Sequence, residues 1–321
     1  MQAFEVVSRQ FQDHFSSLDF PQEPKTLYEP AAYFLGMGGK RIRPVLCLMA
    51  SELYGQIQED ALHVATAIEL FHNFSLIHDD IMDKAPLRRG MATVHNRYGE
   101  PTALLTGDVM LVLAYDYLSR IRPAHLKGIF KEFSACARMV CEGQQLDMDF
   151  ESHQEVKFED YIRMIELKTS VLLAASLKMG AIVAEAHPDD QKHLYEFGKN
   201  LGIAFQIQDD YLDAFGDPEK FGKQVGGDIM ANKKTFLLIR ALDTASPAQR
   251  DELRLLLSGS VPDKVERVVR IFRDCGVDTW ANGLKEKYMQ VASLHLTEVG
   301  VAKEKKLPLN NLMEFLFQRD H

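Results

Sequence analysis

Apolar residues recur with a helical period along almost the whole chain. The clearest run lies in residues 61–79, where positions three or four apart form one series: Ala61, Val64, Ala65, Ile68, Phe71, His72, Ser75 and Asp79. Because residues at this spacing share one face of an α-helix, the run predicts a helix with a packed stripe. Asp79 and the acidic residues that directly follow it are expected at the C-terminal end of this helix.

Prolines and capping signals divide the rest of the chain. Six prolines cluster where helices are expected to begin or break: Pro21, Pro24, Pro30, Pro44, Pro86 and Pro101. None occurs between Pro123 and Pro188, which leaves room for long helices. Residues 246–249 (SPAQ) predict a capping box with proline at the first helical position. Since sustained period-two alternation is missing, we predict an all-α fold in one domain over residues 1–321.

Composition narrows the function classes. The formal net charge of −9 argues against a nucleic-acid partner, because such proteins normally carry excess Lys and Arg. The four cysteines lack zinc-site spacing and are too few for a disulfide scaffold, so we expect reduced thiols and a cytoplasmic location. The N-terminal segment lacks a signal-peptide pattern, and no apolar run reaches membrane-spanning length. We therefore expect an enzyme without a membrane span.

Two aspartate triplets have the same spacing. They are Asp79, Asp80 and Asp83 in LIHDDIMD, and Asp209, Asp210 and Asp213 in IQDDYLD. Residues four apart share a helix face, so each triplet projects two carboxylates in one direction. A cation between the carboxylates relieves their repulsion, and hard divalent ions prefer such oxygen ligands. The pattern predicts a site for several metal ions and a polyanion such as diphosphate.

Basic residues stand beside glycines or aspartates at several places. They are Lys40, Arg41 and Arg43 after Gly38-Gly39, Arg88 and Arg89 before Gly90, Lys168 before Thr169, Lys223 in FGKQVGGD, and Lys233-Lys234 before Thr235. Glycine lets backbone approach an anion closely, and cationic side chains can close on it. The alternative is a nucleotide phosphate loop, but GMGGKR lacks the GxxxxGK[ST] spacing. Anion binding explains the set better.

These motifs resemble the trans-isoprenyl diphosphate synthase family, the head-to-tail prenyltransferases. GGKRIRP, DDIMDKAPLRRG, GQQLD, KTS and FQIQDDYLDAFGDPEKFGKQVGGD occur in this order between about Gly38 and Thr235. A single DDxxD motif would be weak evidence for this family, whereas two such motifs in register with the basic motifs are specific to it. The resemblance implies the isoprenoid synthase fold, with long antiparallel helices around a deep central cavity. It also implies a homodimer and three Mg²⁺ ions.

The resemblance implies a reaction in which an allylic diphosphate (dimethylallyl, geranyl or farnesyl) loses diphosphate. The double bond of isopentenyl diphosphate then attacks the cation, and a proton leaves. Magnesium binds through one or two carboxylates plus phosphate oxygens, which suits sparse aspartates. By motif match, Asp79 and Asp83 hold two ions and Asp209 the third. Asp80, Asp210 and Asp213 are expected to act indirectly or through water.

The same motif match assigns side chains to both diphosphates. Arg88, Lys168, Lys223 and Lys233 are expected to contact the departing diphosphate, while Thr169 and Gln206 orient it and stabilise the carbocation through their dipoles. Gly39, Lys40, Arg43, His72 and Arg89 match the metal-free pocket for isopentenyl diphosphate. The alternative for His72 is an ordinary core histidine. No side chain is nominated as the base, because the released diphosphate is expected to accept the proton.

Product length is expected to depend on the residues before the first aspartates. Phe74 is the fifth residue before Asp79 and Ser75 the fourth, and DDxxD carries no insertion. In the family this combination resembles short-chain synthases and producers of the twenty-carbon product. We therefore expect geranylgeranyl diphosphate, with farnesyl diphosphate as the alternative. Phe74 could instead be ordinary packing bulk.

Two other classes were weighed against this function. A terpene cyclase also ionises an allylic diphosphate, but it needs no second anion pocket, and GGKRIRP argues against it. A non-catalytic partner subunit would typically lack the aspartates or RRG, which are present here. One departure from the family pattern concerns Lys233. Ala231 and Asn232 stand where Glu-Gly often precedes this lysine, which leaves its geometry open.

Overall fold

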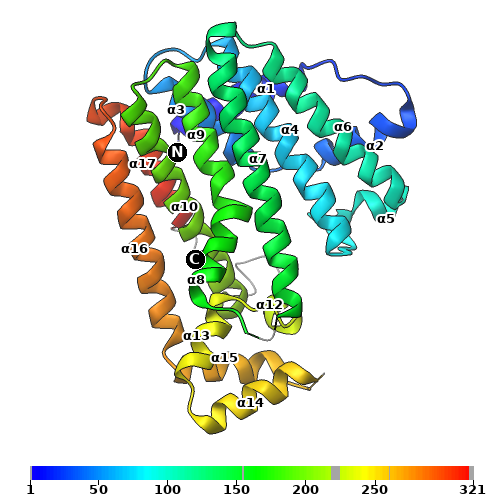
Figure 1. The fold of residues 1–321 in the computed structure, drawn as a ribbon, viewed down its shortest axis with the longest axis vertical. Coiled ribbons are helices and arrows are strands. Elements are labelled where there is room, and N and C mark those ends of the chain that lie inside the picture. The colour runs from blue at the N-terminus through cyan, green and yellow to red at the C-terminus, as the bar shows by residue number, and fades with distance from the viewer. Residues whose placement is uncertain (1, 154, 218–224, 260, 318–321) are drawn as a thin grey trace. The chain divides into compact units, whose positions relative to one another are not determined.

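A computed structural model describes residues 2–153, 155–217, 225–259 and 261–317, and it confirms the all-α prediction (Figure 1). The elements are α1 (Gln2–Ser16), α2 (Lys25–Gly36), α3 (Ile42–Glu52), α4 (Glu59–Met82), β1 (Leu87–Arg88), β2 (Met91–Ala92), α5 (Val94–Tyr98), α6 (Glu100–Ser119), α7 (Pro123–Ser152), α8 (Phe158–Ile165), the π-helix η1 (Glu166–Ser170), α9 (Val171–Val183), α10 (Pro188–Phe215), α12 (Gly227–Met230), α13 (Phe236–Thr244), α14 (Pro247–Ser258), α15 (Lys264–Asp274), α16 (Val277–Glu298) and α17 (Lys303–Phe317). Within these described ranges, the only strands are β1 and β2, which pair as a short antiparallel hairpin.

The helices form two compact units. Unit 1 comprises Met1–Ala137, Ala175–Tyr195 and Val299–Pro308. Unit 2 comprises Arg138–Ala174, Glu196–Glu298 and Leu309–His321. The single domain over residues 1–321 stays a prediction.

Helix α4 is the centre of unit 1. It packs along α6 and against α3, and α2 packs on α6 (Figure 1). Its buried positions extend from Asp60 to Asp80, as the apolar period predicted. Glu59 and Asp60 occupy its first turn, where the helix dipole favours negative charge. Asp79 and Asp80 fall in its last turn, where the dipole disfavours negative charge, so the stability of the helix does not explain these carboxylates.

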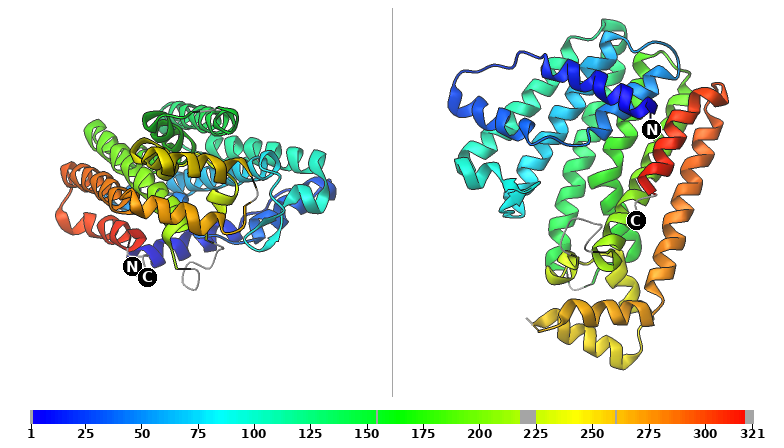
Figure 2. Two further views of the ribbon diagram at one scale, coloured as in Figure 1. Left: turned by 90° about the horizontal axis from the view of Figure 1, so that it is seen from below. Right: turned by 180° about the vertical axis from the view of Figure 1, so that it is seen from behind.

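Unit 2 has its own apolar core, built on α8, α13, α15 and α16. Phe236 and Ile271 are at most 1% exposed there. Helices α14 and α15 lie side by side in this unit, drawn in yellow and light orange in Figure 2. The predicted capping box is confirmed: the Ser246 hydroxyl accepts from the Gln249 N–H, and the Gln249 side chain accepts from the Ser246 N–H.

Prolines were expected where helices begin or break, and two of them lie at helix starts. Pro24 is the N-cap of α2, and Pro101 lies in the first turn of α6. The prediction for Pro30 was wrong, because this residue lies inside α2. A proline inside a helix loses its own N–H hydrogen bond, and its ring crowds the carbonyl of the residue four positions before it. Pro30 is buried, and the packing of its ring helps to offset that loss.

Candidate active site

The glycine pair of GGKRIRP meets the arginine pair of RRG within unit 1. Gly38 and Gly39 have φ angles of +76° and +145°, which L side chains rarely adopt. The Arg89 guanidinium donates to the Gly38 carbonyl. A Cβ atom on Gly39 would lie 2.9 Å from both terminal nitrogens of Arg89. Glycine at 39 is therefore favoured by the backbone conformation, and its missing side chain leaves room for the Arg89 guanidinium.

His72 and Arg43 form the centre of a strongly basic cluster. Nη1 of Arg43, on α3, lies 3.1 Å from Nε2 of His72, on α4. Burial and the neighbouring arginines, Arg43 foremost, hold the pKa of His72 well below its usual value. Burial also lowers the pKa of Arg43 to about 10. A neutral imidazole beside buried guanidinium groups suits an anionic ligand, which would relieve the repulsion between the arginines.

A buried carboxylate that the sequence analysis did not single out lies under this cluster. Glu69 is 2% exposed. Its Oε1 accepts from Arg41 and from Nδ2 of Asn73, the latter at 2.6 Å. Arg41 also donates to the Leu35 carbonyl at 2.9 Å and lies over the Phe15 ring. Arg41 therefore has a structural partner, and it anchors the junction between the loop that carries Lys40 and the start of α3, which carries Arg43.

The first aspartate triplet lies at the C-terminal end of α4. The Asp83 N–H donates to the Asp79 carbonyl at 2.9 Å, and Asp83 keeps helical backbone angles. Asp79 and Asp83 therefore share a helix face, as their spacing predicted. Asp80 is 2% exposed, and Nε of Arg88 lies 2.8 Å from both of its carboxylate oxygens. In this structure Arg88 pairs with Asp80, and its contact with diphosphate stays a prediction.

The second triplet lies near the end of α10, in unit 2. Asp210 is 5% exposed and accepts from the Tyr161 hydroxyl and, at 2.9 Å, from Nε2 of Gln206. Burial, followed by the charge of Asp228, raises the pKa of Asp210 to about 7. The buried position of Asp210 agrees with the expectation that it acts indirectly, and the metal contact of Asp209 stays a prediction.

Asp213 is held by the segment that follows the second triplet. Its carboxylate accepts from the Asp228 N–H at 2.9 Å, and its backbone carbonyl accepts from the Gly226 N–H at 2.6 Å. Gly226 has a φ of +87°, and a Cβ atom there would lie 2.5 Å from Cγ1 of Val265. Glycine in VGGD is therefore needed to bring the start of α12 to Asp213.

The structure explains the departure from the family pattern beside Lys233. Asn232 adopts the left-handed conformation with a φ of +56°. Glycine adopts this conformation freely, and asparagine is among the other residues that tolerate it best. Oδ1 of Asn232 also accepts from Nζ of Lys264 at 2.6 Å. The turn is preserved without glycine, and Nζ of Lys233 lies 3.4 Å from Asp228.

Lys168 and Thr169 lie in the π-helix η1, a form that often marks functional sites. Two glycines accommodate it. A Cβ atom on Gly143 would lie 2.2 Å from the Lys168 backbone nitrogen, and one on Gly202 would lie 2.7 Å from Cα of Ser170. The Thr169 hydroxyl donates to Oε1 of Gln206 at 3.3 Å, so two of the predicted site residues meet.

Lys168 has a close carboxylate partner. Its Nζ lies 2.6 Å from Oδ2 of Asp147, the last residue of GQQLD. Asp147 was not predicted as a site residue, although the motif that contains it was recognised. Lys223 lies outside the described residues, so its assignment to the allylic diphosphate stays a prediction.

The carboxylate oxygens of both triplets are donors of the kind that a hard divalent cation prefers, but within the described residues no three acidic, histidine or cysteine side chains converge on one point. Each triplet lies near the C-terminal end of a helix, where the dipole disfavours carboxylates. Burial raises the pKa of Asp80, Asp210 and Asp213, because the charged form is poorly stabilised there. These three carboxylates have protein partners, so Asp79, Asp83 and Asp209 are the oxygen donors that would hold magnesium.

Phe74 and Ser75, the predicted chain-length residues, have different surroundings on α4. The Phe74 ring centroid lies 4.7 Å from that of His78 and 5.6 Å from that of Phe71. His78 fits over Gly107 of α6, where a Cβ atom would lie 2.3 Å from Nε2 of His78. The Ser75 hydroxyl donates to the His72 carbonyl at 2.8 Å. Phe74 thus belongs to a cluster of rings whose positions depend on one another.

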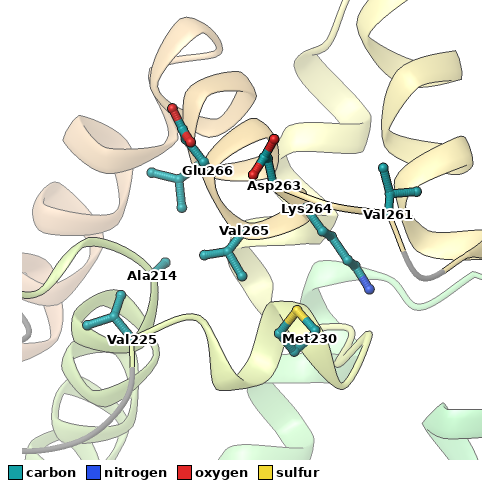
Figure 3. A pocket seen from close by; sticks show the side chains of 9 residues that line it. Ala214, Val225, Met230, Val261, Asp263, Lys264, Val265 and Glu266 are labelled. Carbon is teal, nitrogen blue, oxygen red and sulfur yellow. The ribbon is translucent and has the colours of Figure 1, made fainter.

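A surface groove of about 530 Å³ lies elsewhere, against α12 and α15 (Figure 3). It is lined by Ala214, Val225, Met230, Val261, Asp263, Lys264, Val265, Glu266 and Val269. None of these belongs to the predicted site. The amine of Lys264, one of three charged side chains in the lining, donates to Oδ1 of Asn232. The groove therefore does not replace the site built on the sequence motifs.

Comparisons with known proteins agree with this arrangement. A family model described as polyprenyl synthetase matches residues 24–275. Geranylgeranyl diphosphate synthase of Saccharolobus solfataricus is 39% identical over 309 residues, covering 92% of this chain and 91% of its own. A crystal structure of a geranylgeranyl pyrophosphate synthase superposes with a TM-score of 0.92 at 42% identity, covering 99% and 98% of the two chains.

A further solved structure is informative about ligands. It is geranylgeranyl pyrophosphate synthase from Corynebacterium glutamicum, complexed with isoprenyl diphosphate and magnesium. Its identity to this chain is 27% and its TM-score 0.86, with 99% of each chain covered.

None of the helices in the described ranges is long and apolar enough to cross a membrane. The cytoplasmic location stays a prediction.

Proposed function

Because the chain belongs to the polyprenyl synthetase family and is a short-chain prenyltransferase, we propose that it makes geranylgeranyl diphosphate from isopentenyl diphosphate and an allylic diphosphate. Relatives named as geranylgeranyl diphosphate synthases, 36–39% identical over most of the chain, support this product over farnesyl diphosphate. The isoprenoid synthase fold is shared with the solved structures it resembles.

The observation that carries the proposal is a basic cluster that includes His72 of α4, the helix that also carries the first acid cluster. Arg43, His72 and Arg89 form the basic cluster beside Gly39, and Asp79 follows His72 by two turns of α4. Two diphosphate substrates need two anion sites of different chemistry. A terpene cyclase has one diphosphate substrate and needs no such second pocket.

In the proposed reaction the basic cluster binds isopentenyl diphosphate through charge-assisted hydrogen bonds. Asp79, Asp83 and Asp209 would hold magnesium, which supplies neutralisation of leaving-group charge on the allylic diphosphate. Arg88, Lys168, Lys223 and Lys233 contact that diphosphate as it departs. Thr169 and Gln206 present their dipoles to the allylic cation. The released diphosphate accepts the proton, so no side-chain base is required.

The function is tested by incubation with labelled isopentenyl diphosphate and each allylic primer in the presence of Mg²⁺. Products are dephosphorylated and separated by chromatography. The twenty-carbon alcohol is expected as the main product from dimethylallyl, geranyl and farnesyl diphosphates. A fifteen-carbon end product would support the farnesyl alternative, and a cyclised hydrocarbon would support a cyclase. Absence of any condensation product would refute the proposal.

Chain length is expected to change in opposite directions in two variants of α4. Phe74→Ala removes a ring from the path proposed for the growing tail and should extend the product beyond twenty carbons. Ser75→Phe places a ring one turn before Asp79, a rise of roughly 6 Å, and should stop the chain at fifteen carbons. Chromatography of the dephosphorylated products measures both effects. An unchanged distribution in both variants would place the length determinant elsewhere.

We propose that the chain forms a homodimer through an apolar surface on α6 and α7. Leu105, Val112 and Phe130 are 60%, 64% and 51% exposed, and the Phe130 ring lies 5.7 Å from that of Tyr115. Clustered exposed apolar residues favour association, and the family resemblance selects a second copy as the partner.

Val112→Glu is expected to shift the sedimentation mass toward the monomer. Val6→Glu, at an equally exposed site on α1, is the control, and equal behaviour of both variants would reject this surface.

A further inference from the structure

A chain of hydrogen bonds leads from the buried core of unit 2 to Thr169, which is partly exposed. The Tyr161 hydroxyl donates to Asp210, Nε2 of Gln206 donates to Oδ1 of Asp210 at 2.9 Å, and the Thr169 hydroxyl donates to Oε1 of Gln206 at 3.3 Å. The four residues come from α8, α10 and η1 (Figure 1). We call this chain the Tyr161 relay. Tyr161 was not singled out by any sequence motif.

The inner end of the relay is rigid. Tyr161 is 4% exposed, and its ring lies 6.0 Å from that of Phe236 in the apolar core. A buried phenol hydroxyl needs a hydrogen-bond partner, and Asp210 supplies it. The outer end is also fixed, because Gly143 and Gly202 pack against the backbone of the π-helix that carries Thr169. The relay therefore has little freedom to change its geometry.

The direction of the hydrogen bonds matters for the chemistry. Asp210 accepts from Gln206, so the amide nitrogen of Gln206 faces Asp210 and the amide oxygen faces Thr169. The Thr169 proton then points at Gln206, and the lone pairs of the hydroxyl oxygen remain available to a positive charge. If the amide were reversed, its NH₂ group would donate to the threonine oxygen and turn the hydroxyl proton outward.

We propose that Tyr161 and Asp210 are positioning residues that set the amide orientation of Gln206 and thereby aim the Thr169 oxygen at the developing allylic cation. This inference rests on the proposed function, since it needs a carbocation beside Thr169. Asp210 acts here through its hydrogen bonds and not as a metal ligand. A dipole oriented before the reaction stabilises charge without reorganisation, so the relay acts on kcat more than on KM.

Three variants test the relay. Asp210→Asn keeps one acceptor oxygen, which the Tyr161 hydroxyl takes, so its NH₂ group faces Gln206 and reverses that amide, and kcat should fall about 10²-fold. Combining Asp210→Asn with Gln206→Glu returns an acceptor oxygen to Thr169 and keeps the net charge of the pair, so kcat should return to within about tenfold of the parent. Tyr161→Phe removes one hydrogen bond and should lower kcat about three- to tenfold. In each case the KM for both substrates should change much less than kcat.

Tyr288→Phe is the matched control, because Tyr288 packs on the same apolar core and is not a member of the relay. It should leave kcat unchanged, and thermal melting checks that all variants fold. A double variant no more active than Asp210→Asn, or equal kcat in Tyr161→Phe and Tyr288→Phe, would overturn the relay. So would an Asp210→Asn variant that regains full kcat at high Mg²⁺, since Asp210 would then act through the metal. An inactive parent protein would refute the proposed function itself.

Discussion

Asp79→Ala and Asp209→Ala are each expected to lower turnover at least about 10²- to 10³-fold, because each removes a carboxylate proposed to hold magnesium against the departing diphosphate. Both acid clusters are required in the proposed reaction, so neither loss should be compensated by the other. Removal of Mg²⁺ by a chelator should abolish turnover in the parent protein. Steady-state rates at saturating substrate and Mg²⁺ measure these effects.

The fold should survive both substitutions. Each aspartate lies beside other carboxylates of its triplet, so its removal reduces charge repulsion, and Asp79 gives up only a 3.6 Å contact with Nη2 of Arg88, which keeps Asp80 as its partner. Asp251→Ala, at a site with a 77% exposed side chain on α14, is the control and should keep full activity. If either active-site variant kept near-parental turnover with an unchanged thermal transition, the assignment of that aspartate to metal would be wrong.

Glu69→Leu is expected to lower the free energy of unfolding by about 3–5 kcal/mol, because it leaves the buried Arg41 guanidinium without its carboxylate partner. The side chains of Glu69 and Arg41 are only 3% and 12% exposed, so water cannot replace the lost contact well. The loop that carries Lys40 and the start of α3 that carries Arg43 should lose their anchor. The KM for isopentenyl diphosphate should therefore rise more than the KM for the allylic substrate.

Urea unfolding and steady-state kinetics measure these two effects. Glu59→Gln, at an 84% exposed side chain on the same helix, is the control and should change stability by less than about 1 kcal/mol. The double variant Arg41→Met with Glu69→Leu should recover much of the lost stability, since an apolar pair often replaces a buried ion pair well. A Glu69→Leu protein as stable as the Glu59→Gln control would show that the buried pair is not a stabilising anchor.

The helices were predictable because their signals are local. The apolar series in residues 61–79 predicted α4, and the Ser246 capping box predicted the start of α14. The period of 3.6 residues placed Asp79 and Asp83 on one face without knowledge of other helices. Pro30 shows the limit of such local rules, because the burial of its ring in α2 outweighs the lost N–H.

The functional motifs were also recognised from the sequence, including those whose glycines proved necessary. The glycines are Gly39 in GGKRIRP, Gly143 in GQQLD and Gly226 in VGGD. Each of them packs against a residue that is far away in the sequence. A Cβ atom on Gly143 would collide with the backbone at Lys168, and this proximity is decided by how α7 packs on η1. The motif identifies where the glycine stands in the sequence, and the helix packing explains why a larger residue does not fit there.

By itself, the sequence determined the helical fold class, the two acid clusters at helix ends and the positions of the basic motifs, because these depend on spacing within one or two turns. Only the tertiary structure decided the pairs Arg41–Glu69, Lys168–Asp147 and Tyr161–Asp210. Their members are 28, 21 and 49 residues apart. An apolar period says which face of a helix is buried, but it does not say which helix covers that face or at what rotation. Buried polar partners depend on that choice, since each buried donor must meet an acceptor where the helices pack together.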